Sequence, residues 1–358
     1  MGLAYLQQMA RIFVKVASSY TRRRTRLDYL PPVFWLEPTN HCNLHCAMCP
    51  NSVIERGEGG FLPFTDCVRV VDEIAQHYPH GGATIALFLS GEPLLHPDIF
   101  KMIAYARQRG LNVNLATNAT LLTTDVVQEL LAAPPSLLII SFDGYDAPSY
   151  EKARAGASFT ATLANIHRFL AAKRQRAAEQ PRVRLYSLIL DSTRSVEERQ
   201  RFEEFFASEF TAGGIDEFLI EEAGNWAGLF SGEQGDSFVP KVTRGKRYYP
   251  CIRAWDSMSI RWDGNVVACC ADFTGSVVLG NIRDKSLLEI WNDTPFQRFR
   301  QRLITGELAD VPLCAKGCDM LYPQGVVWGL PRELQLHRKF LRDLKSMVRA
   351  RYGEKRQR

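Results

Sequence analysis

Short apolar runs alternate with amphipathic stretches along the chain from about residue 33 onward. The apolar runs are short and rich in branched or aromatic side chains, which predicts strands at Val33–Leu36, Thr84–Ser90, Asn112–Ala116, Leu137–Phe142, Val183–Leu190 and Glu217–Glu221. The stretches between them repeat apolar residues at helical spacing, which predicts helices at Asp66–His77, Asp98–Arg109, Thr124–Ala132, Phe159–Ala178 and Val196–Phe210. Thr65, Thr123 and Ser195 are the expected N-caps of three of these helices.

Six strand–helix repeats predict an α/β fold with a parallel sheet and right-handed crossovers. Six units fall short of a closed eight-fold barrel, so we expect a partial (βα)6 TIM-like barrel with its chemistry at the carboxyl ends of the strands. Two further apolar runs flank Asp263-Gly264 and predict a hairpin, with two short helices after it. We therefore expect a basic amphipathic segment (1–32), the barrel (33–222), a Gly-rich linker (223–250), a small α+β domain (251–330) and a basic C-terminal helix or tail (331–358).

The formal net charge of +5 is unevenly distributed, since both ends of the chain are basic and the body between them is acidic. An acidic body argues against nucleic acid as a partner of the active domain. Leu3, Leu6, Met9, Ile12, Phe13 and Val16 lie near one face of a predicted helix. This helix either packs on the barrel or, with its basic neighbours, makes peripheral contact with a membrane.

Nine cysteines occur in a chain with no secretory signal and no apolar run long enough to span a bilayer. This usage favours a cytoplasmic location and metal-binding or catalytic thiols over disulfides. Cys42, Cys46 and Cys49 lie within eight residues, directly after the first predicted strand. Three thiolates from one loop can bind three irons of a four-iron cube and leave the fourth iron open. A tetrahedral zinc site with a fourth ligand is the alternative at this point.

The Cys-x₃-Cys-x₂-Cys spacing resembles that of the radical S-adenosylmethionine (radical SAM) superfamily, and further motifs of that family follow it in order. Gly91-Glu92-Pro93, Thr117-Asn118 and the Ser141-Phe-Asp143 segment each follow or end a successive predicted strand. A carboxylate at Glu92 is a suitable partner for the ammonium group of methionine. The resemblance implies cofactor-binding roles for Met48, Gly91, Glu92, Pro93, Thr117, Asn118, Ser141, Asp143 and Arg154. Met48 stands where the family often has an aromatic residue, and Ala119 replaces a usual glycine.

A second group of cysteines follows near the C-terminus and resembles the SPASM or shorter twitch extension of radical SAM enzymes, which holds auxiliary 4Fe–4S clusters. Five cysteines imply one auxiliary cluster with the ligands Cys251, Cys269, Cys314 and Cys318; a Cys₄ zinc site is the alternative. Cys270 should face away from its neighbour Cys269, since adjacent strand residues point to opposite sides. Cys270 is then a packing residue or a hydrogen-atom donor to a substrate radical, and Cys67 a core residue.

The resemblance implies an oxidoreductase-like enzyme that reductively cleaves S-adenosylmethionine to a 5′-deoxyadenosyl radical, which abstracts a hydrogen atom from substrate. The outcome is dehydrogenation where the auxiliary cluster accepts an electron, and epimerisation where it does not. An external donor such as flavodoxin or ferredoxin supplies the electrons. The short segment before the first strand favours a small molecule such as a sugar or aminocyclitol, with a ribosomal peptide as the alternative substrate. A non-catalytic zinc-binding scaffold is the alternative of another class.

Overall fold

The computed structural model describes residues 3–52, 54, 58–190, 194–224, 226–227, 247–315, 318–322, 326–327 and 330–331. Most of the predicted linker and all of the predicted C-terminal helix or tail beyond Pro331 lie outside the described residues. All nine cysteines lie within them.

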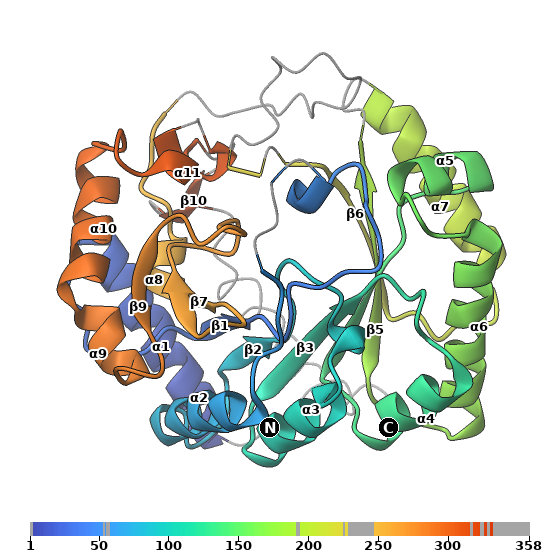
Figure 1. The fold of residues 1–358 in the computed structure, drawn as a ribbon, viewed down its shortest axis with the longest axis horizontal. Coiled ribbons are helices and arrows are strands. Elements are labelled where there is room, and N and C mark those ends of the chain that lie inside the picture. Colours follow the sequence, from blue (N-terminus) through green and yellow to red (C-terminus); the bar gives the residue numbers. More distant parts are fainter. Residues whose placement is uncertain are drawn as a thin grey trace, which may run out of the picture.

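Six parallel strands form one side of a continuous sheet (Figure 1). They are β1 (Val33–Leu36), β2 (Thr84–Ala86), β3 (Asn112–Thr117), β4 (Leu137–Ser141), β5 (Arg182–Ile189) and β6 (Glu217–Glu222). Neighbours in sequence are neighbours in the sheet, and each of these pairings is parallel. The prediction of an α/β fold with a partial (βα)6 barrel is confirmed.

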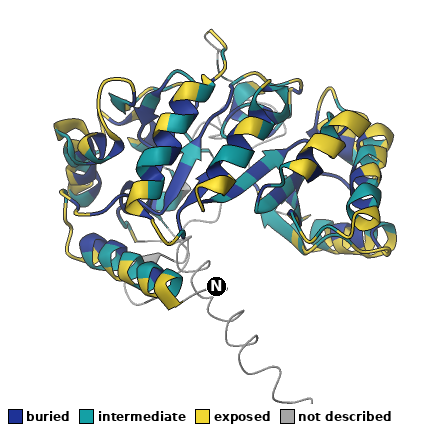
Figure 2. Cartoon of the chain, turned by 90° about the horizontal axis from the view of Figure 1, so that it is seen from below, coloured by how far each residue is buried: buried dark blue, intermediate teal, exposed yellow. Residues whose placement is uncertain are grey.

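Helices between the strands cover the outer face of the barrel (Figure 1). They are α2 (Phe64–His77), α3 (Ile99–Gln108), α4 (Thr124–Ala132), α5 (Ala147–Ala153), α6 (Phe159–Gln175) and α7 (Ser195–Glu209). Along β3, β4 and β5 buried residues alternate with half-buried ones, because one face of a strand packs under the helices and the other faces the barrel interior. The helices show the same division, with buried faces toward the sheet and exposed faces outward (Figure 2).

The C-terminal strands extend the barrel sheet rather than forming a sheet of their own. The predicted hairpin is confirmed as β7 (Ser257–Ile260) and β8 (Asn265–Val267), and β9 (Val278–Asn281) follows antiparallel to β8. β7 pairs in parallel with β1, on the edge opposite β2. The remaining α-helices and strands of the described residues are α8 (Arg253–Asp256), α9 (Leu287–Asn292), α10 (Thr294–Thr305), α11 (Pro312–Ala315), β10 (Val326–Val327) and β11 (Leu330–Pro331).

The N-terminal helix α1 (Leu3–Thr21) packs against the C-terminal segment, behind α8 in Figure 1. Met9, Val16 and Tyr20 are buried, and the Tyr20 hydroxyl donates to Pro250 O at 2.8 Å. Packing on the body of the protein is therefore confirmed for this helix, while membrane contact stays a prediction. Within the described ranges no helix is both long and apolar enough to cross a bilayer.

Two of the three predicted N-caps are wrong. The Thr123 side chain caps α4 by accepting from Val126 N, as expected. Thr65 lies inside α2, which begins at Phe64 after Pro63, because a proline supplies a backbone angle that suits a helix start. Ser195 is likewise the first residue of α7, with Arg194 at the cap position.

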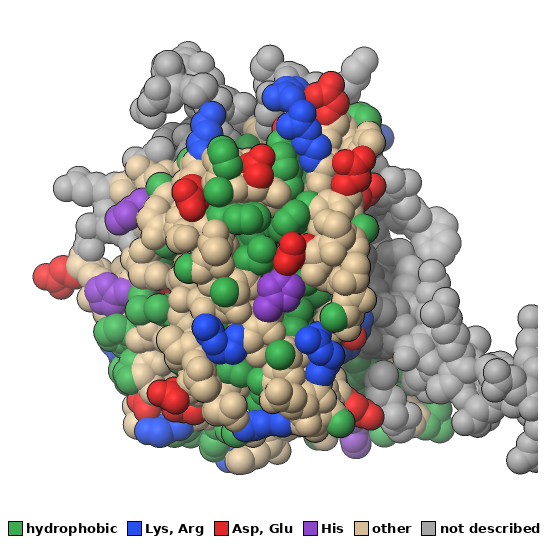
Figure 3. Space-filling model, turned by 90° about the vertical axis from the view of Figure 1, so that its right-hand side faces the viewer, with side chains coloured by type: hydrophobic (Ala, Val, Ile, Leu, Met, Phe, Trp, Pro, Cys, Tyr) green, Lys and Arg blue, Asp and Glu red, His purple; other side chains and the backbone are tan. Residues whose placement is uncertain are grey.

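On the face built by α6 and α7, acidic and basic side chains are interspersed (Figure 3).

Candidate functional site

A cavity of about 980 Å³ extends from the carboxyl ends of the barrel strands into the barrel interior. The two predicted cysteine groups line this one space, although some 200 residues separate them in the sequence. The lining cysteines are Cys42, Cys46, Cys49, Cys251, Cys269, Cys270, Cys314 and Cys318. Of the predicted cofactor-binding residues, Met48, Gly91, Glu92, Thr117, Asn118, Ser141 and Arg154 also line it, whereas Pro93 and Asp143 are not among its lining residues.

The loop with the first three cysteines is held by backbone hydrogen bonds to the segment at the end of α5. His45 N donates to Ala155 O at 3.0 Å, and Ala47 N donates to Ala153 O at 2.9 Å. The three thiols are half-buried and face the cavity. Three soft donors on one anchored loop fit a four-iron cube that has one iron without a protein ligand.

A buried ion pair supports this loop from the barrel wall. Arg154 Nε and Nη2 lie 2.8 and 2.5 Å from Asp143 Oδ2, and Arg154 Nη1 lies 3.9 Å from Cys46 Sγ. Asp143 Oδ1 accepts from Leu188 N at 2.7 Å, so both carboxylate oxygens are engaged by protein. Burial raises the pKa of the Cys46 thiol, and the Arg154 charge opposes that rise. Arg154 is therefore placed to stabilise a thiolate at Cys46, while Asp143 positions Arg154.

Glu92 is a buried carboxylate that holds two strand ends together at the cavity wall. Its Oε1 accepts from the Thr117 hydroxyl at 2.8 Å and from Leu94 N at 3.1 Å, and its Oε2 accepts from Asn118 N at 2.8 Å. Burial raises the pKa of Glu92, and these hydrogen bonds oppose the rise. The arrangement offers a preorganised carboxylate to a cationic group in the cavity.

Backbone constraints explain two small residues in this region. A Cβ on Gly91 would lie 2.2 Å from Thr39 O, so only glycine lets the loop after β2 approach the loop before Cys42. Ala119 has a φ of +61°, in the left-handed region that favours glycine. This strain explains why the resembled family usually has glycine at that position.

The thiols of the second cysteine group are half-buried, like those of the first. Burial raises the pKa of the Cys251 thiol to about 12 and that of the Cys314 thiol to about 11, and it raises the pKa of Cys269 and Cys270 as well. A positive metal centre that binds such thiols makes them thiolates at neutral pH. Their chemistry fits an auxiliary iron–sulfur cluster.

Cys269 and Cys270 both line the cavity, and the expectation that only Cys269 of the pair reaches a cluster stays a prediction. The strand β8 ends at Val267, so strand alternation no longer applies at these two residues. Cys67 is a core residue of α2 with no exposed surface, as predicted.

No three His, Cys, Asp or Glu side chains within the described ranges lie close enough to bind one common metal ion. A four-iron cube does not require this closeness, because each thiolate binds a different iron.

Several polar residues of the cavity were missed by the sequence analysis. Arg184 and Glu217 face each other across β5 and β6 with 2.7 Å between Nη2 and Oε2, and the Tyr186 hydroxyl donates to Glu221 at 3.2 Å. The sequence signal was the pair of polar residues at alternate positions of a predicted strand, Arg184 and Tyr186. Such a pair indicates that one face of the strand is not packed in the core. Arg253 also lines the cavity, two residues after Cys251.

Comparison with known proteins gives matches in both halves of the chain. The model of the radical SAM superfamily matches residues 36–177, and that of the SPASM iron–sulfur cluster-binding domain matches residues 251–319. The AdoMet-dependent heme synthase of Methanosarcina barkeri is 36% identical over 137 residues, which cover 38% of each chain. The PqqA peptide cyclase of Gluconobacter oxydans is 26% identical over 303 residues, which cover 75% of this chain and 79% of that one.

Solved structures share the fold at low sequence identity. Streptococcus suis SuiB bound to S-adenosylmethionine gives a TM-score of 0.60 at 17% identity, covering 88% of this chain and 76% of SuiB. BtrN in complex with AdoMet and 2-DOIA gives a TM-score of 0.53 at 20% identity, covering 82% of this chain and 94% of BtrN.

For the first three curated relatives, the aligned part spans only 31–38% of their own length. The two family models together match more than half of the chain, which therefore belongs to the radical SAM superfamily, uses S-adenosylmethionine and a 4Fe–4S cluster, and carries an auxiliary iron–sulfur domain of the SPASM type.

Proposed function

We propose that this chain uses a 5′-deoxyadenosyl radical to remove a hydrogen atom from a substrate held between its two cysteine groups, and that the auxiliary site takes up the second electron, so that the reaction is a dehydrogenation. The observation that carries the proposal is the single cavity lined by both cysteine groups and by the cofactor motifs. Epimerisation is the alternative outcome, in which that electron stays with the substrate.

Cys42, Cys46 and Cys49 would hold the first cluster, with Arg154 offsetting the negative charge at Cys46. When bound and reduced, this cluster supplies the electron that splits the sulfonium C–S bond of S-adenosylmethionine. Glu92 would hold the ammonium group of the cofactor, because it is the carboxylate that Thr117 and Asn118 fix at the cavity wall. Burial of these groups excludes water and strengthens their electrostatic interactions.

Three further residues complete the proposed cofactor site. Ser141 ends β4 at the cavity and offers a hydroxyl, and the amide of Asn118 lies beside it on the next strand end. Met48 is buried against the cavity and offers a polarisable thioether to a flat aromatic ring such as adenine. Pro93 and Asp143 would act by shaping the wall rather than by touching the cofactor.

Cys251, Cys269, Cys314 and Cys318 would hold the auxiliary cluster, which leaves Cys270 as the cysteine without an assigned ligand role at the same cavity. In the epimerisation alternative, Cys270 would donate a hydrogen atom to the substrate radical.

The cavity volume limits the substrate. A cavity of about 980 Å³ is at the upper end for ligand pockets, yet here it must also accommodate cofactor and clusters. A small molecule, such as a sugar or aminocyclitol, or one side chain of a peptide is the substrate proposed to share this space. The peptide alternative has its own support, since one relative aligned over 75% of this chain is a peptide cyclase and SuiB has been crystallised with its precursor peptide. A heme synthase aligns over 74% of the chain, so the length of the alignment alone does not select the peptide. A flavodoxin- or ferredoxin-type donor and a cytoplasmic, reducing environment are part of this proposal.

Oxygen-free purification followed by iron, sulfide and product analysis tests the proposal. We expect about eight irons and eight sulfides per chain, and slow release of 5′-deoxyadenosine after addition of dithionite and S-adenosylmethionine. The variant with alanine at Cys42, Cys46 and Cys49 should lose about half of the iron and all of the 5′-deoxyadenosine. A wild-type protein that binds two zinc ions and releases no 5′-deoxyadenosine would support the scaffold alternative instead.

A further inference from the structure

Glu37 is a carboxylate with no exposed surface that the mechanism above does not use. It directly follows β1, five residues before Cys42, and it is not among the residues that line the main cavity. Burial raises its pKa, and hydrogen bonds from Ser90 and Trp262 and the charge of Arg261 oppose the rise. A buried carboxylate is costly unless the protein satisfies it, so these partners show which parts of the chain Glu37 holds together.

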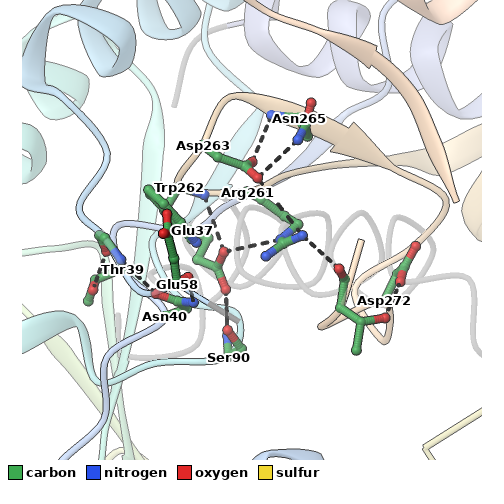
Figure 4. Close-up of polar contacts among 12 residues, drawn as sticks. Glu37, Thr39, Asn40, Glu58, Ser90, Arg261, Trp262, Asp263, Asn265 and Asp272 are labelled. Carbon is green, nitrogen blue, oxygen red and sulfur yellow. Dashed lines mark hydrogen bonds and ion pairs between the residues drawn. The ribbon is translucent and has the colours of Figure 1, made fainter. Parts of the chain in front are cut away.

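On the barrel side, Glu37 holds the residue that leads into the proposed cofactor loop (Figure 4). Its Oε1 accepts from the Ser90 hydroxyl and from Ser90 N at 3.3 Å. Ser90 lies two residues before Glu92, the proposed partner of the ammonium group of S-adenosylmethionine. Ser90 O also accepts from the side-chain amide of Asn51, two residues after Cys49. Glu37 therefore helps to set the backbone position from which Glu92 reaches the cavity.

On its other side, Glu37 contacts the turn after β7, in the part of the chain that matches the SPASM domain (Figure 4). Its Oε2 accepts from Trp262 N at 3.2 Å and lies 3.9 Å from Arg261 Nε. Arg261 Nη1 in turn donates to Thr274 O at 2.9 Å. A Cβ on Gly275 would lie 2.1 Å from the same Nη1, so the guanidinium packs on the bare glycine backbone. Arg261 is thus fixed between Glu37 and the segment around Thr274.

These contacts form a continuous path from the second cysteine group to the cofactor loop. The segment that Arg261 contacts is bonded back to Cys269, because Asp272 N donates to Cys269 O at 3.1 Å. The two carboxylate oxygens of Glu37 serve different parts of the chain, so a shift of either part leaves a buried donor unpaired, which is costly. The position of the cofactor loop relative to the auxiliary domain is therefore fixed at Glu37.

We propose that Glu37 and Arg261 are positioning residues for the S-adenosylmethionine site, so that the auxiliary domain contributes to cofactor affinity through contacts that do not touch the cofactor. The inference rests on the proposed function, because it acts through Glu92 as the partner of the ammonium group.

The test measures the affinity for S-adenosylmethionine by equilibrium dialysis on the cluster-loaded, oxygen-free protein. Glu37→Gln keeps the shape of the side chain but turns one of its two acceptors into a donor. Its NH2 group must then face Ser90 N or Trp262 N, and one of these buried donors loses its acceptor. Ser90→Ala is the second variant on the barrel side, since it removes one hydrogen bond to Glu37 and leaves the carboxylate in place.

Arg261→Met tests the auxiliary side, because it removes the charge that faces Glu37 and keeps an unbranched side chain. Arg283→Met is the matched control. Arg283 also reaches from the part that matches the SPASM domain to a barrel carboxylate, with 2.9 Å between its Nε and Asp66 Oδ2. Within the described ranges this pair makes no hydrogen bond to Glu37 or Ser90.

We expect the dissociation constant of S-adenosylmethionine to rise about fivefold in Glu37→Gln, about threefold in Arg261→Met and about twofold in Ser90→Ala, and to stay at the wild-type value in Arg283→Met. Iron content and the rate of 5′-deoxyadenosine release at saturating cofactor should remain those of the wild type. Because Glu37 acts through Glu92, Glu37→Gln should add less than about twofold in a Glu92→Gln background.

Unchanged affinity in Glu37→Gln or Arg261→Met overturns the inference, as does an equal loss in Arg283→Met or a full additional loss in the Glu92→Gln background. If Glu37→Gln does not load its clusters, Ser90→Ala replaces it in the same comparison, and unchanged affinity there is the refuting result. A Glu92→Gln variant that binds S-adenosylmethionine as tightly as the wild type refutes the proposed cofactor site itself, and the single Glu92→Gln variant shows this without any change at Glu37.

Discussion

Asp256 carries a buried charge that should destabilise the fold at neutral pH. The residue has no exposed surface, and neither carboxylate oxygen has a hydrogen-bond partner of good geometry among the described residues, because the nearby Ser257 hydroxyl donates to Arg253 O at 3.1 Å instead. Burial raises its pKa from 3.8 to about 6, although the nearby Arg253 charge opposes the rise. Because the folded state holds this proton more tightly than the unfolded state, the stabilising contribution is complete below pH 4 and is lost as the pH rises through about 6. A shift of about two units corresponds to ~3 kcal/mol.

Asp256→Asn removes the charge and keeps the shape of the side chain. We expect the variant to be more stable than the wild type by ~3 kcal/mol above pH 7, with the difference shrinking toward zero near pH 4. The assay is urea unfolding of the metal-free protein, followed by circular dichroism at a series of pH values. The quantity compared at each pH is the difference in unfolding free energy between variant and wild type. The contributions of the other carboxyl groups are the same in both proteins and cancel in this difference.

Asp272→Asn is the matched control, because Asp272 is equally buried but fully hydrogen-bonded. Its carboxylate accepts from Ser276 N at 2.7 Å and from Val277 N at 2.9 Å. Asparagine cannot replace both acceptors, so this variant should lose about 1–3 kcal/mol of stability. The reasoning about Asp256 fails if Asp256→Asn is less stable than the wild type at neutral pH, or if the difference between them does not change with pH.

Three further outcomes follow from the main cavity. Glu92→Gln should weaken S-adenosylmethionine binding by about tenfold or more in equilibrium dialysis, since it removes a charge-assisted hydrogen bond. Because burial raises the pKa of Glu92, the affinity of the wild type for S-adenosylmethionine should also fall as the pH drops. The affinity of the variant should not change with pH in this way. Asp143→Asn and Arg154→Met should each lower the free energy of unfolding in urea by about 3–5 kcal/mol, because each single change leaves a buried partner uncompensated. The double variant should lose less than the sum of the two single losses. Additive losses below about 1 kcal/mol each would argue against a buried ion pair. Cys270→Ala should abolish product but leave iron content unchanged if Cys270 donates a hydrogen atom, and unchanged product would exclude that role.

Much of the barrel could be predicted because its signals are local. The strands of the barrel are short apolar or alternating runs, and residues at or after the carboxyl ends of β2, β3 and β4 lie at the cavity. Thr117 and Ser141 end β3 and β4, Glu92 lies in the loop after β2, and all three line the cavity. Asp143 lies two residues beyond the end of β4, where alternation no longer applies, and it contacts Arg154 and Leu188 instead of the cavity. A motif alone could not distinguish a lining residue from a positioning one.

Residues that act through distant contacts carried no local signal. Glu37 is one polar residue after an apolar strand, and only the fold shows that it contacts Ser90 and the turn at Trp262. The strand β7 alternates serine with an apolar residue in the sequence, which is typical of a strand with one exposed face, yet all four of its positions are buried in the fold. Its partner β1 precedes it by more than 200 residues, and sequence patterns do not report such pairings.

The pairing of β1 with β7 explains how the two cysteine groups come to share one cavity. The two strands are parallel and in register from Val33 with Ser257 to Leu36 with Ile260, so both end at the same edge of the sheet. Glu37 N continues the pairing by donating to Ile260 O at 2.9 Å, and the first cysteine loop follows Glu37. A slip of two residues would move one group by about 7 Å relative to the other. The spacing of the two sites is therefore set by backbone hydrogen bonds within one sheet, which fixes it more firmly than a flexible connection between separate units would.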